Sequence, residues 1–287
     1  MRRCLNPVTT GRPSDLRAWV RLAQAHGFAG VEFGAGELSR LVAAEGIDAA
    51  RQLQRETGVA LATFGLPGDW QGSDDTTFRQ AVSELDHLAA VAAAAGCARA
   101  GTWVRPTVPD GAVPAAWALR VVTRLRACCE VLGRHGIQLA IEWVGTPSLR
   151  VGRVPFLWTA AHTVALCDAI GLSNAGLLLD SWHWHMTGAA EADLELVPAS
   201  RIVHVHINDA PDIPLADQLD NRRLLPGASG VIDVAGLLRK LAAKGYEGFV
   251  AIETFWEESA RLGPEAATAA AAQAFRDVLQ GCQPEEA

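Results

Sequence analysis

The sequence predicts a single (β/α)8 barrel of the TIM type, and three observations support this prediction. The chain has 287 residues, a length typical of one such barrel. Eight short segments of β-type composition alternate with longer segments of helical periodicity. No glycine-rich G-x-G-x-x-G pattern follows the first strand segment, which argues against an open dinucleotide-binding sheet. We expect the barrel to span residues 1–280, with residues 281–287 as a frayed tail.

Each predicted element rests on local signals. The predicted strands cover residues 3–6, 30–33, 60–64, 98–103, 138–143, 176–180, 202–207 and 249–254. The predicted helices cover residues 14–26, 37–57, 77–95, 114–135, 155–169, 191–196, 233–244 and 264–279. Ser14 and Asp233 are the expected N-caps of the first and seventh helices, because their side chains can accept a backbone hydrogen bond. Gly27, Gly136 and Gly245 stand where C-terminal glycines end helices.

The composition excludes several classes of function. The formal net charge is −7 and the arginines are scattered, whereas binding of nucleic acid needs clustered basic residues. No apolar run of about 18 residues predicts a membrane span, and residues 1–7 lack the apolar core of a signal peptide. The six cysteines lack C-x-x-C spacing and are expected to be reduced. We expect a cytoplasmic protein without nucleic-acid or membrane partners. The formation of a homo-oligomer is compatible with the sequence.

Four of the predicted strands end on a residue that can bind a metal ion. These residues are Glu142, Asp180, His206 and Glu253. Strand side chains alternate between two faces, and the residue before each candidate is Ile, Leu or Val, which suits packing against outer helices. The four candidates should therefore point into the barrel mouth at the carboxyl ends of the strands, where the active sites of TIM barrels lie.

The chemistry of this set predicts one divalent cation. Three carboxylates in one mouth would repel one another, and the same strand ends carry no Lys or Arg. A buried ion pair is the alternative for any single acidic residue, but four such residues on consecutive strands favour a metal. Oxygen ligands with one imidazole suit Mn²⁺ best, with Mg²⁺, Co²⁺ and Zn²⁺ as alternatives.

Six segments of the chain carry a resemblance to a known family. They are CLNPVTT at 4–10, IEWVGTP at 141–147, LLLDSWHWH at 177–185, HVHIND at 204–209, LPG at 225–227 and AIE at 251–253. With these segments the chain resembles the xylose-isomerase-like superfamily of sugar isomerases and epimerases, and within it most closely the inosose (2-keto-myo-inositol) isomerases. The resemblance spans nearly the whole chain, and the segments around Glu142 and Asp180 are its most specific part.

The resemblance implies an activity and roles for the site residues. It implies isomerisation or epimerisation of a small keto-sugar or keto-cyclitol, with Glu142, Asp180, His206 and Glu253 as ligands of the metal. A metal on the carbonyl and its neighbouring hydroxyl would stabilise an enediolate, and Glu142 and Glu253 would transfer the proton. His183 and an arginine near position 222 would contact the substrate. Arg222 follows Asn221, whereas Arg223 has the family spacing to Pro226, so both remain candidates.

Aromatic and imidazole side chains near the strand ends add further candidates. Six tryptophans fall at or just after predicted strand ends, and together they suggest an aromatic wall for a sugar ring or an aromatic aglycone: Trp70, Trp103, Trp143, Trp182, Trp184 and Trp256. Among them we expect Trp103 and Trp184 to contact the substrate. His204 shares a face with His206 one layer deeper, which favours a supporting role. His185 is a weaker candidate for a contact with a ligand or a substrate hydroxyl.

Two departures from the family pattern leave the substrate open. Residues 226–230 read PGASG where many members have Pro-Gly-Glu/Gln-Gly, and the strand ending near Glu32 lacks the basic residue that we expect in inosose isomerases. The alternative is a metal-dependent lyase, dehydratase or decarboxylase that acts on an oxidised (3-oxo) sugar or its C-glycoside. A barrel that cleaves damaged DNA would need more histidines at the mouth. A barrel without catalytic activity would not need the intact set of four ligands.

Overall fold

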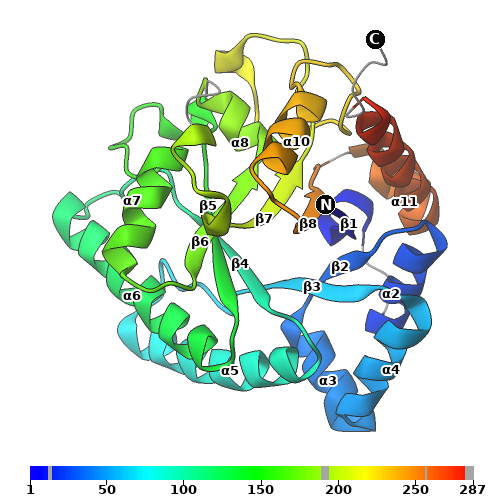
Figure 1. The fold of residues 1–287 in the computed structure, drawn as a ribbon. Coiled ribbons are helices and arrows are strands. Elements are labelled where there is room, and N and C mark those ends of the chain that lie inside the picture. Colours follow the sequence, from blue (N-terminus) through cyan, green and yellow to red (C-terminus); the bar gives the residue numbers. More distant parts are fainter. Residues whose placement is uncertain (12–14, 189–193, 256, 282–287) are drawn as a thin grey trace.

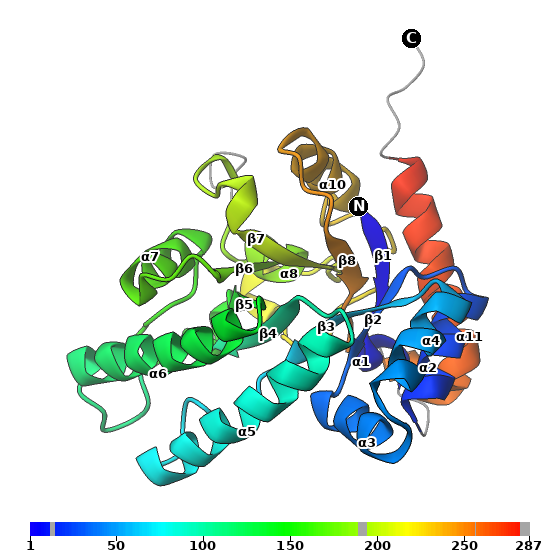
Figure 2. The ribbon, with the colours of Figure 1, turned by 60° about the horizontal axis from the view of Figure 1, so that its bottom comes forward.

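The computed structural model is a closed barrel of eight parallel strands with helices outside it (Figures 1 and 2). It describes residues 1–11, 15–188, 194–255 and 257–281. The strands follow one another around the barrel, and β8 returns to pair with β1. They are β1 (Arg2–Leu5), β2 (Gly30–Phe33), β3 (Ala60–Gly65), β4 (Arg99–Val104), β5 (Gln138–Trp143), β6 (Ala175–Asp180), β7 (Ile202–Ile207) and β8 (Phe249–Ile252). The predicted fold class is confirmed, with every strand within a residue or two of its expected place.

The long helices form the outer layer, and short ones follow individual strands. The outer helices are α2 (Leu16–Ala25), α3 (Ala35–Glu45), α4 (Ile47–Thr57), α5 (Asp75–Ala94), α6 (Pro114–Arg134), α7 (Ala160–Ile170), α10 (Val234–Ala243) and α11 (Glu257–Gln280). The short elements are α1 (Pro7–Thr10), α8 (Ser181–Met186) and the 3-10 turns η1 (Pro147–Arg150), η2 (Ala199–Arg201) and η3 (Leu215–Asp217). Helices α1 and α8 directly follow β1 and β6, so they lie at the end of the barrel that holds the candidate site.

Some predicted helices differ from the observed ones. The predicted helix 37–57 is two helices, α3 and α4, because Gly46 between them has φ +82°, a left-handed conformation that favours glycine. The predicted helix 155–169 begins only at Ala160, after the N-cap Thr159. The predicted helix 264–279 is the second part of α11, which is kinked at Gly263. The predicted helix 191–196 lies largely outside the described residues.

The predicted cap of the seventh helix and the predicted glycine ends are confirmed, whereas the cap of the first helix is Asp15 and not Ser14. Asp233 accepts a hydrogen bond from the Gly236 backbone N–H at 2.7 Å and so caps α10. In α2 the cap is Asp15, which accepts from the Ala18 N–H, whereas Ser14 lies outside the described residues. Gly27, Gly136 and Gly245 all have positive φ, as expected where helices end.

Strand alternation separates an apolar jacket from a small interior. The outward side chains Ile141, Leu179 and Val205 are completely buried under the helices. The inward side chains near the amino ends of the strands form two small apolar clusters, one with Cys4, Ala62, Phe249 and Ala251, the other with Ala140, Leu178 and Val203. These clusters fill the floor of the barrel, so the inward residues nearer the carboxyl ends lie above an apolar base.

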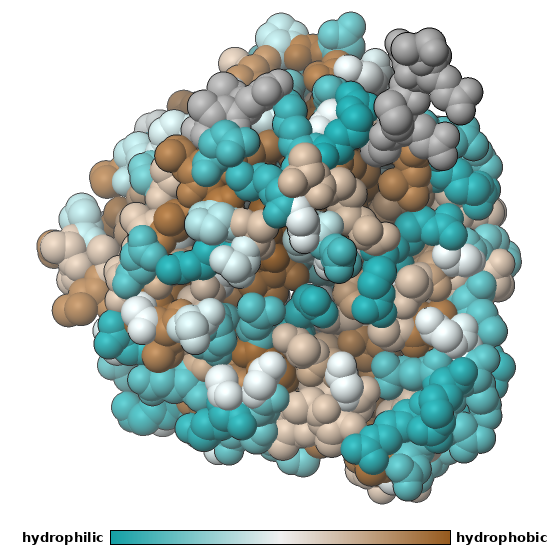
Figure 3. Space-filling view, viewed as in Figure 1, coloured by the Kyte–Doolittle hydropathy of each residue, from teal (hydrophilic) through white to brown (hydrophobic). Residues whose placement is uncertain are grey.

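Hydrophilic and apolar residues form a mosaic on the face shown in Figure 3, and hydrophilic atoms gather at its lower right, over α3 and α4. Within the part of the chain that the structure describes, no helix is long and apolar enough to cross a membrane. The cysteines at 4, 97, 128, 129 and 167 are unpaired and buried, as expected, and Cys282 is not among the described residues.

Candidate metal centre

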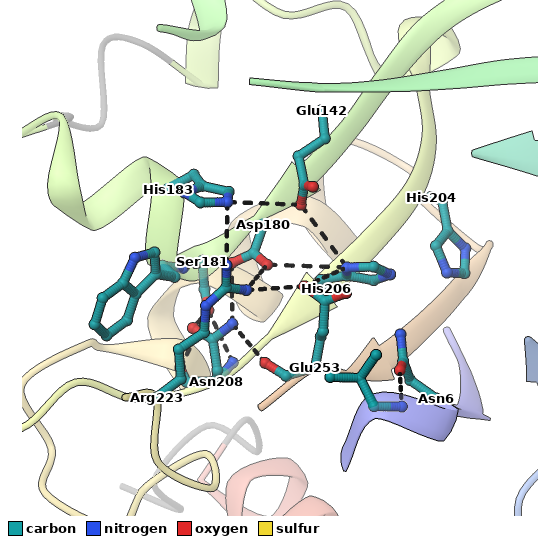
Figure 4. A network of polar contacts seen from close by, with 12 residues as sticks. Asn6, Glu142, Asp180, Ser181, His183, His204, His206, Asn208, Arg223 and Glu253 are labelled. Carbon is teal, nitrogen blue, oxygen red and sulfur yellow. Dashed lines mark hydrogen bonds and ion pairs between the residues drawn. The ribbon is translucent and has the colours of Figure 1, made fainter. Parts of the chain in front are cut away.

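Four side chains from consecutive strands converge at the mouth of the barrel. Glu142, Asp180 and His206 belong to β5, β6 and β7, and Glu253 directly follows β8. One potential ligand atom from each of the four lies within 4.8 Å of the others. Figure 4 shows that these side chains point toward one another. The structure therefore brings together all four residues that the sequence predicted as metal ligands.

Two buried atoms in this cluster have no hydrogen-bond partner among the described residues. They are Glu142 Oε1 and His206 Nδ1. The His206 Nδ1 atom lies 3.4 Å from Glu253 Oε2 and 3.8 Å from both Asp180 Oδ2 and Glu142 Oε1. An unpaired buried polar atom is costly, and three carboxylate oxygens around one imidazole nitrogen form a suitable donor set for a divalent cation. The residues present therefore fit a metal ion.

Asp180 is held by a network through its Oδ1, while its Oδ2 faces the cluster. Its Oδ1 accepts hydrogen bonds from the Trp182 backbone N–H at 2.6 Å and from Asn208 Nδ2 at 3.0 Å. Asn208 also donates to the Glu253 carbonyl, and its Oδ1 accepts a hydrogen bond from the Ser181 hydroxyl. Because Asp180 is the N-cap of α8, the start of that helix fixes the carboxylate and directs Oδ2 toward the cluster.

The structure distinguishes the two adjacent arginines. Arg223 is buried, and its Nη1 donates to Asp180 Oδ2 at 2.9 Å and to Glu253 Oε2 at 2.8 Å. Its Nη2 lies 3.3 Å from Asp220 Oδ1. Arg222 is exposed. The premise that the mouth carboxylates lack a basic partner was wrong, because Arg223 reaches them from the loop after β7 rather than from a strand end.

The two glutamates of the cluster have opposite proton affinities. Burial raises the pKa of Glu142 well above its ordinary value, and the negative charges of Glu253 and Asp180 raise it further. Burial would also raise the pKa of Glu253, but the charges of His206 and Arg223 lower it well below the ordinary value. The guanidinium contacts Glu253 and not Glu142. The cluster therefore holds one firmly ionised carboxylate beside one that binds a proton readily.

His183 is a neutral imidazole next to the cluster. Burial and then the charge of Arg223 lower the pKa of His183 to about 4. Its Nδ1 accepts a hydrogen bond from the Gly145 backbone N–H at 3.2 Å, and its Nε2 faces two other groups of the cluster. That Nε2 lies 4.0 Å from Glu142 Oε1 and 3.2 Å from Arg223 Nη2. A Cβ at position 145 would lie 2.4 Å from the His183 carbonyl oxygen, so this approach requires glycine.

The aromatic wall is smaller than expected. Trp103 pairs with Glu142 in the β4–β5 register, faces the mouth with it and is 50% exposed. Trp184, on α8, is partly buried and packs against the core. Trp70, Trp143 and Trp182 are buried in the core. Trp143 directly follows the inward ligand Glu142, so strand alternation turns it toward the outer helices. Trp256 is outside the described residues. Of the six tryptophans, Trp103 lies at the mouth, whereas three are buried in the core and do not form an aromatic wall.

A second polar cluster adjoins the first and was not expected as a unit. Glu32 on β2 accepts hydrogen bonds from His204 Nε2 and His206 Nε2, each at 2.9 Å. Burial would raise the pKa of Glu32, but the charge of His206 and hydrogen bonds from both histidines lower it to about 2. His204, expected in a supporting role, is completely buried here. The alternation of β2 could have indicated this cluster, since Glu32 is the polar residue of an otherwise apolar strand.

The fold and this cluster define the chain as a TIM barrel with a metal-type donor set at the carboxyl ends of its strands. Residues 20–278 match the model of the xylose isomerase-like TIM barrel family. The chain therefore belongs to this family, and it is an enzyme of the sugar isomerase and epimerase superfamily. The resemblance predicted from the sequence is confirmed.

Relatives and solved structures agree with this assignment. An inosose isomerase of Bacillus velezensis is 24% identical over 92% of both chains. An inosose isomerase of Halalkalibacterium halodurans is 33% identical over 51% of this chain, and this match spans only about half (49%) of the relative's own length. A xylose isomerase domain protein from Alicyclobacillus acidocaldarius has a TM-score of 0.88 at 28% identity, over 99% of this chain and all of the other. The IOLI protein with a bound zinc atom shares the fold, with a TM-score of 0.82 at 21% identity over 99% of each chain.

Proposed function

We propose that this protein is a divalent-metal-dependent isomerase or epimerase of a small, neutral keto-sugar or keto-cyclitol of the inosose type. The observation that carries the proposal is the convergence of Glu142, Asp180, His206 and Glu253 around two unpartnered buried atoms. The inosose isomerases among the relatives support the substrate class. We propose residues 1–280 as one catalytic barrel and Mn²⁺ as the preferred ion, although the zinc-bound neighbour keeps Zn²⁺ as an alternative.

The chain's own residues have distinct tasks in this reaction. An ion held by the four ligands would polarise the substrate carbonyl and make the neighbouring C–H more acidic. Glu142 lies on β5 and Glu253 directly follows β8 in the same cluster, so they can remove a proton from the α carbon and return one. The Arg223 guanidinium, with the His183 ring beside it, can donate a hydrogen bond to a substrate oxygen. Trp103 can pack against C–H groups of the ring.

The charge of the site favours a neutral substrate. Glu32, Glu142, Asp180, Asp220 and Glu253 lie within the two clusters or against Arg223. In the described part of the chain, Arg223 is the only guanidinium or ammonium paired with these carboxylates. Even with a divalent ion bound, five negative charges exceed the three positive charges of the ion and Arg223. A carboxylate-bearing keto acid would enter a field of its own sign, whereas a polyhydroxy ketone would not.

One experiment distinguishes isomerisation from the alternative reaction. The protein is loaded with Mn²⁺ and incubated in D2O with an inosose, and the substrate is followed by NMR and mass spectrometry. We expect deuterium at the α carbon and a second keto isomer, with no group lost. Loss of water or of another group would instead support a lyase on an oxidised sugar, an activity class to which the 3-dehydroshikimate dehydratase among the relatives points. Absence of exchange with every ion would exclude the proposed chemistry.

A further inference from the structure

Glu32 connects two histidines to the start of the chain through one carboxylate. Its Oε1 accepts from His204 Nε2 and from His206 Nε2, each at 2.9 Å. Its Oε2 accepts from Asn6 Nδ2 at 3.0 Å. The Trp19 indole N–H also donates to the Glu32 backbone carbonyl at 2.8 Å. Side chain and backbone of Glu32 are therefore both fixed, although no part of Glu32 contacts the other three carboxylates of the metal centre.

The direction of these hydrogen bonds follows from neighbouring groups. Asn6 is the N-cap of α1, and its Oδ1 accepts from the Val8 backbone N–H at 2.7 Å. The amide group of Asn6 must therefore present its NH₂ to Glu32, which leaves the carboxylate as the acceptor. On the other side, the Thr63 hydroxyl lies 3.4 Å from His204 Nδ1 and can donate to it. Every polar atom around the carboxylate of Glu32 is thus a donor directed at it.

The carboxylate of Glu32 determines which nitrogen of the His206 ring carries the proton and which has the free lone pair. Since Glu32 Oε1 only accepts, His206 Nε2 carries the proton, and the lone pair of the neutral ring is on Nδ1. Nδ1 is the unpartnered atom that faces Glu142, Asp180 and Glu253. We infer that Glu32 is a positioning residue that selects the Nδ1 lone pair of His206 for the metal proposed above. This inference rests on the proposed metal centre.

A direct metal site among Glu32, His204 and His206 is the other arrangement that these atoms allow. Two features argue against it. The 2.9 Å distances are those of charge-assisted hydrogen bonds, and Asn6 occupies the second oxygen of Glu32. An ion there would also need a lone pair from Nε2 of His206, whose Nδ1 already faces the main cluster. Outer carboxylates that orient a ligating histidine change metal affinity by about 10- to 100-fold, which sets the expected effect.

The test measures metal affinity rather than turnover. Dissociation constants for Mn²⁺ and Zn²⁺ are determined by competition with a chelator for the wild-type protein and for Glu32→Gln. The amide keeps the size of the side chain but removes its negative charge, and its NH₂ must face a donor, either Asn6 or the two histidines. We therefore expect affinity to fall about 10- to 100-fold. The matched control is Glu130→Gln, the same exchange at an exposed site of α6, which should change affinity less than about twofold. Circular dichroism checks that each variant is folded, and Glu32→Asp replaces Glu32→Gln if the latter does not fold.

A spectroscopic readout separates positioning from general support of the fold. In the zinc-loaded protein with ¹⁵N-labelled histidine, we expect His206 to show a protonated Nε2 and a metal-bound Nδ1. Coordination through Nε2 would overturn the inference, and so would an affinity of the Glu32 variants equal to that of the wild type. Failure of the wild-type protein to bind any divalent ion would instead overturn the proposed function, so the two failures are distinguishable.

Discussion

The two halves of the barrel mouth differ in how far the protein satisfies its own polar atoms. On the side of β1, β2 and β3, the side chains of Asn6, Glu32 and Thr63 form a hydrogen-bonded network with His204 of β7, and each donor in it has an acceptor. Around β5 to β8, Glu142 Oε1 and His206 Nδ1 have none among the described residues, even though Arg223 neutralises part of the charge. His206 belongs to both halves, with one ring nitrogen in each.

This difference indicates which half of the mouth is rigid without a ligand and which half is arranged to bind one. A satisfied buried network stabilises one geometry, whereas buried polar groups without partners cost free energy until a ligand arrives. The network around Glu32 can therefore hold His206 in place while ligands bind to and leave the cluster of β5 to β8. Experiments that remove a component from either half test this division.

The largest effect should come from removal of the metal. Dialysis against a chelator should abolish the isotope exchange of the proposed substrate, and added Mn²⁺ should restore it. With the ion at 100 times its dissociation constant, binding stabilises the fold by about 2.7 kcal/mol, a rise in Tm of roughly 5–10 °C. Differential scanning calorimetry measures this rise. Full activity of a protein shown by elemental analysis to be metal-free would contradict the prediction.

Glu142→Gln should separate activity from stability. The substitution removes a ligand charge and a proton acceptor, so kcat should fall by about 10²- to 10⁴-fold. The same change relieves the repulsion that raises the pKa of Glu142, so the metal-free variant should be at least as stable as the metal-free wild type. Glu130→Gln, at an exposed site of α6, is the control for both measurements. A variant with unchanged kcat would remove Glu142 from the mechanism.

Arg223→Met should destabilise the metal-free protein. The buried guanidinium pairs with Asp180 and Glu253, and its loss leaves these carboxylates uncompensated, at a cost of about 3–5 kcal/mol. The adjacent Arg222→Met is the matched control, because that side chain is exposed and should change stability by less than about 0.5 kcal/mol. Urea unfolding of both variants without metal gives the comparison. Equal stabilities would show that the neutralising role of Arg223 is wrong.

The smallest effect should come from Trp103→Ala. Half of this side chain is exposed at the mouth, so we expect unchanged stability and a KM several-fold higher, equivalent to about 1 kcal/mol of lost contact. Trp143→Ala provides the contrast, since that indole is completely buried and its removal should cost about 3–5 kcal/mol of stability. Steady-state kinetics and thermal melts on both variants complete the test. An unchanged KM for Trp103→Ala would place the substrate elsewhere.

The fold was predictable because its signals are local. Each strand has a β-type run, and glycines such as Gly27 and Gly245 mark helix ends by their need for positive φ. The break at Gly46 was missed because a glycine inside a helical pattern looks tolerable until its neighbours fix its conformation. The four ligand-type residues were predictable for the same reason, since each ends a parallel strand and such ends meet at one rim.

The sequence pattern could not predict which loop side chains enter the site or which distant strands lie near each other. Arg222 and Arg223 are adjacent in the chain, and only the path of the loop after β7 turns the second one inward. Glu32 and His206 are far apart in sequence, and their contact depends on how the closed barrel brings β2 near β7. The tryptophans were misjudged for another reason: the alternation that directs Glu142 inward also directs Trp143 outward, and this was available from the sequence.

The seam where β1 closes the barrel against β8 links the beginning of the chain to its chemistry. Asn6 binds Glu32, and the Thr9 hydroxyl donates to the Ile252 carbonyl and accepts from the Thr254 N–H, on either side of Glu253. Transient opening of this seam would loosen both sides of the mouth at once. The rate at which a bound ion escapes should therefore follow the hydrogen exchange of amides in β1, and a bulky fusion at the amino terminus should accelerate both.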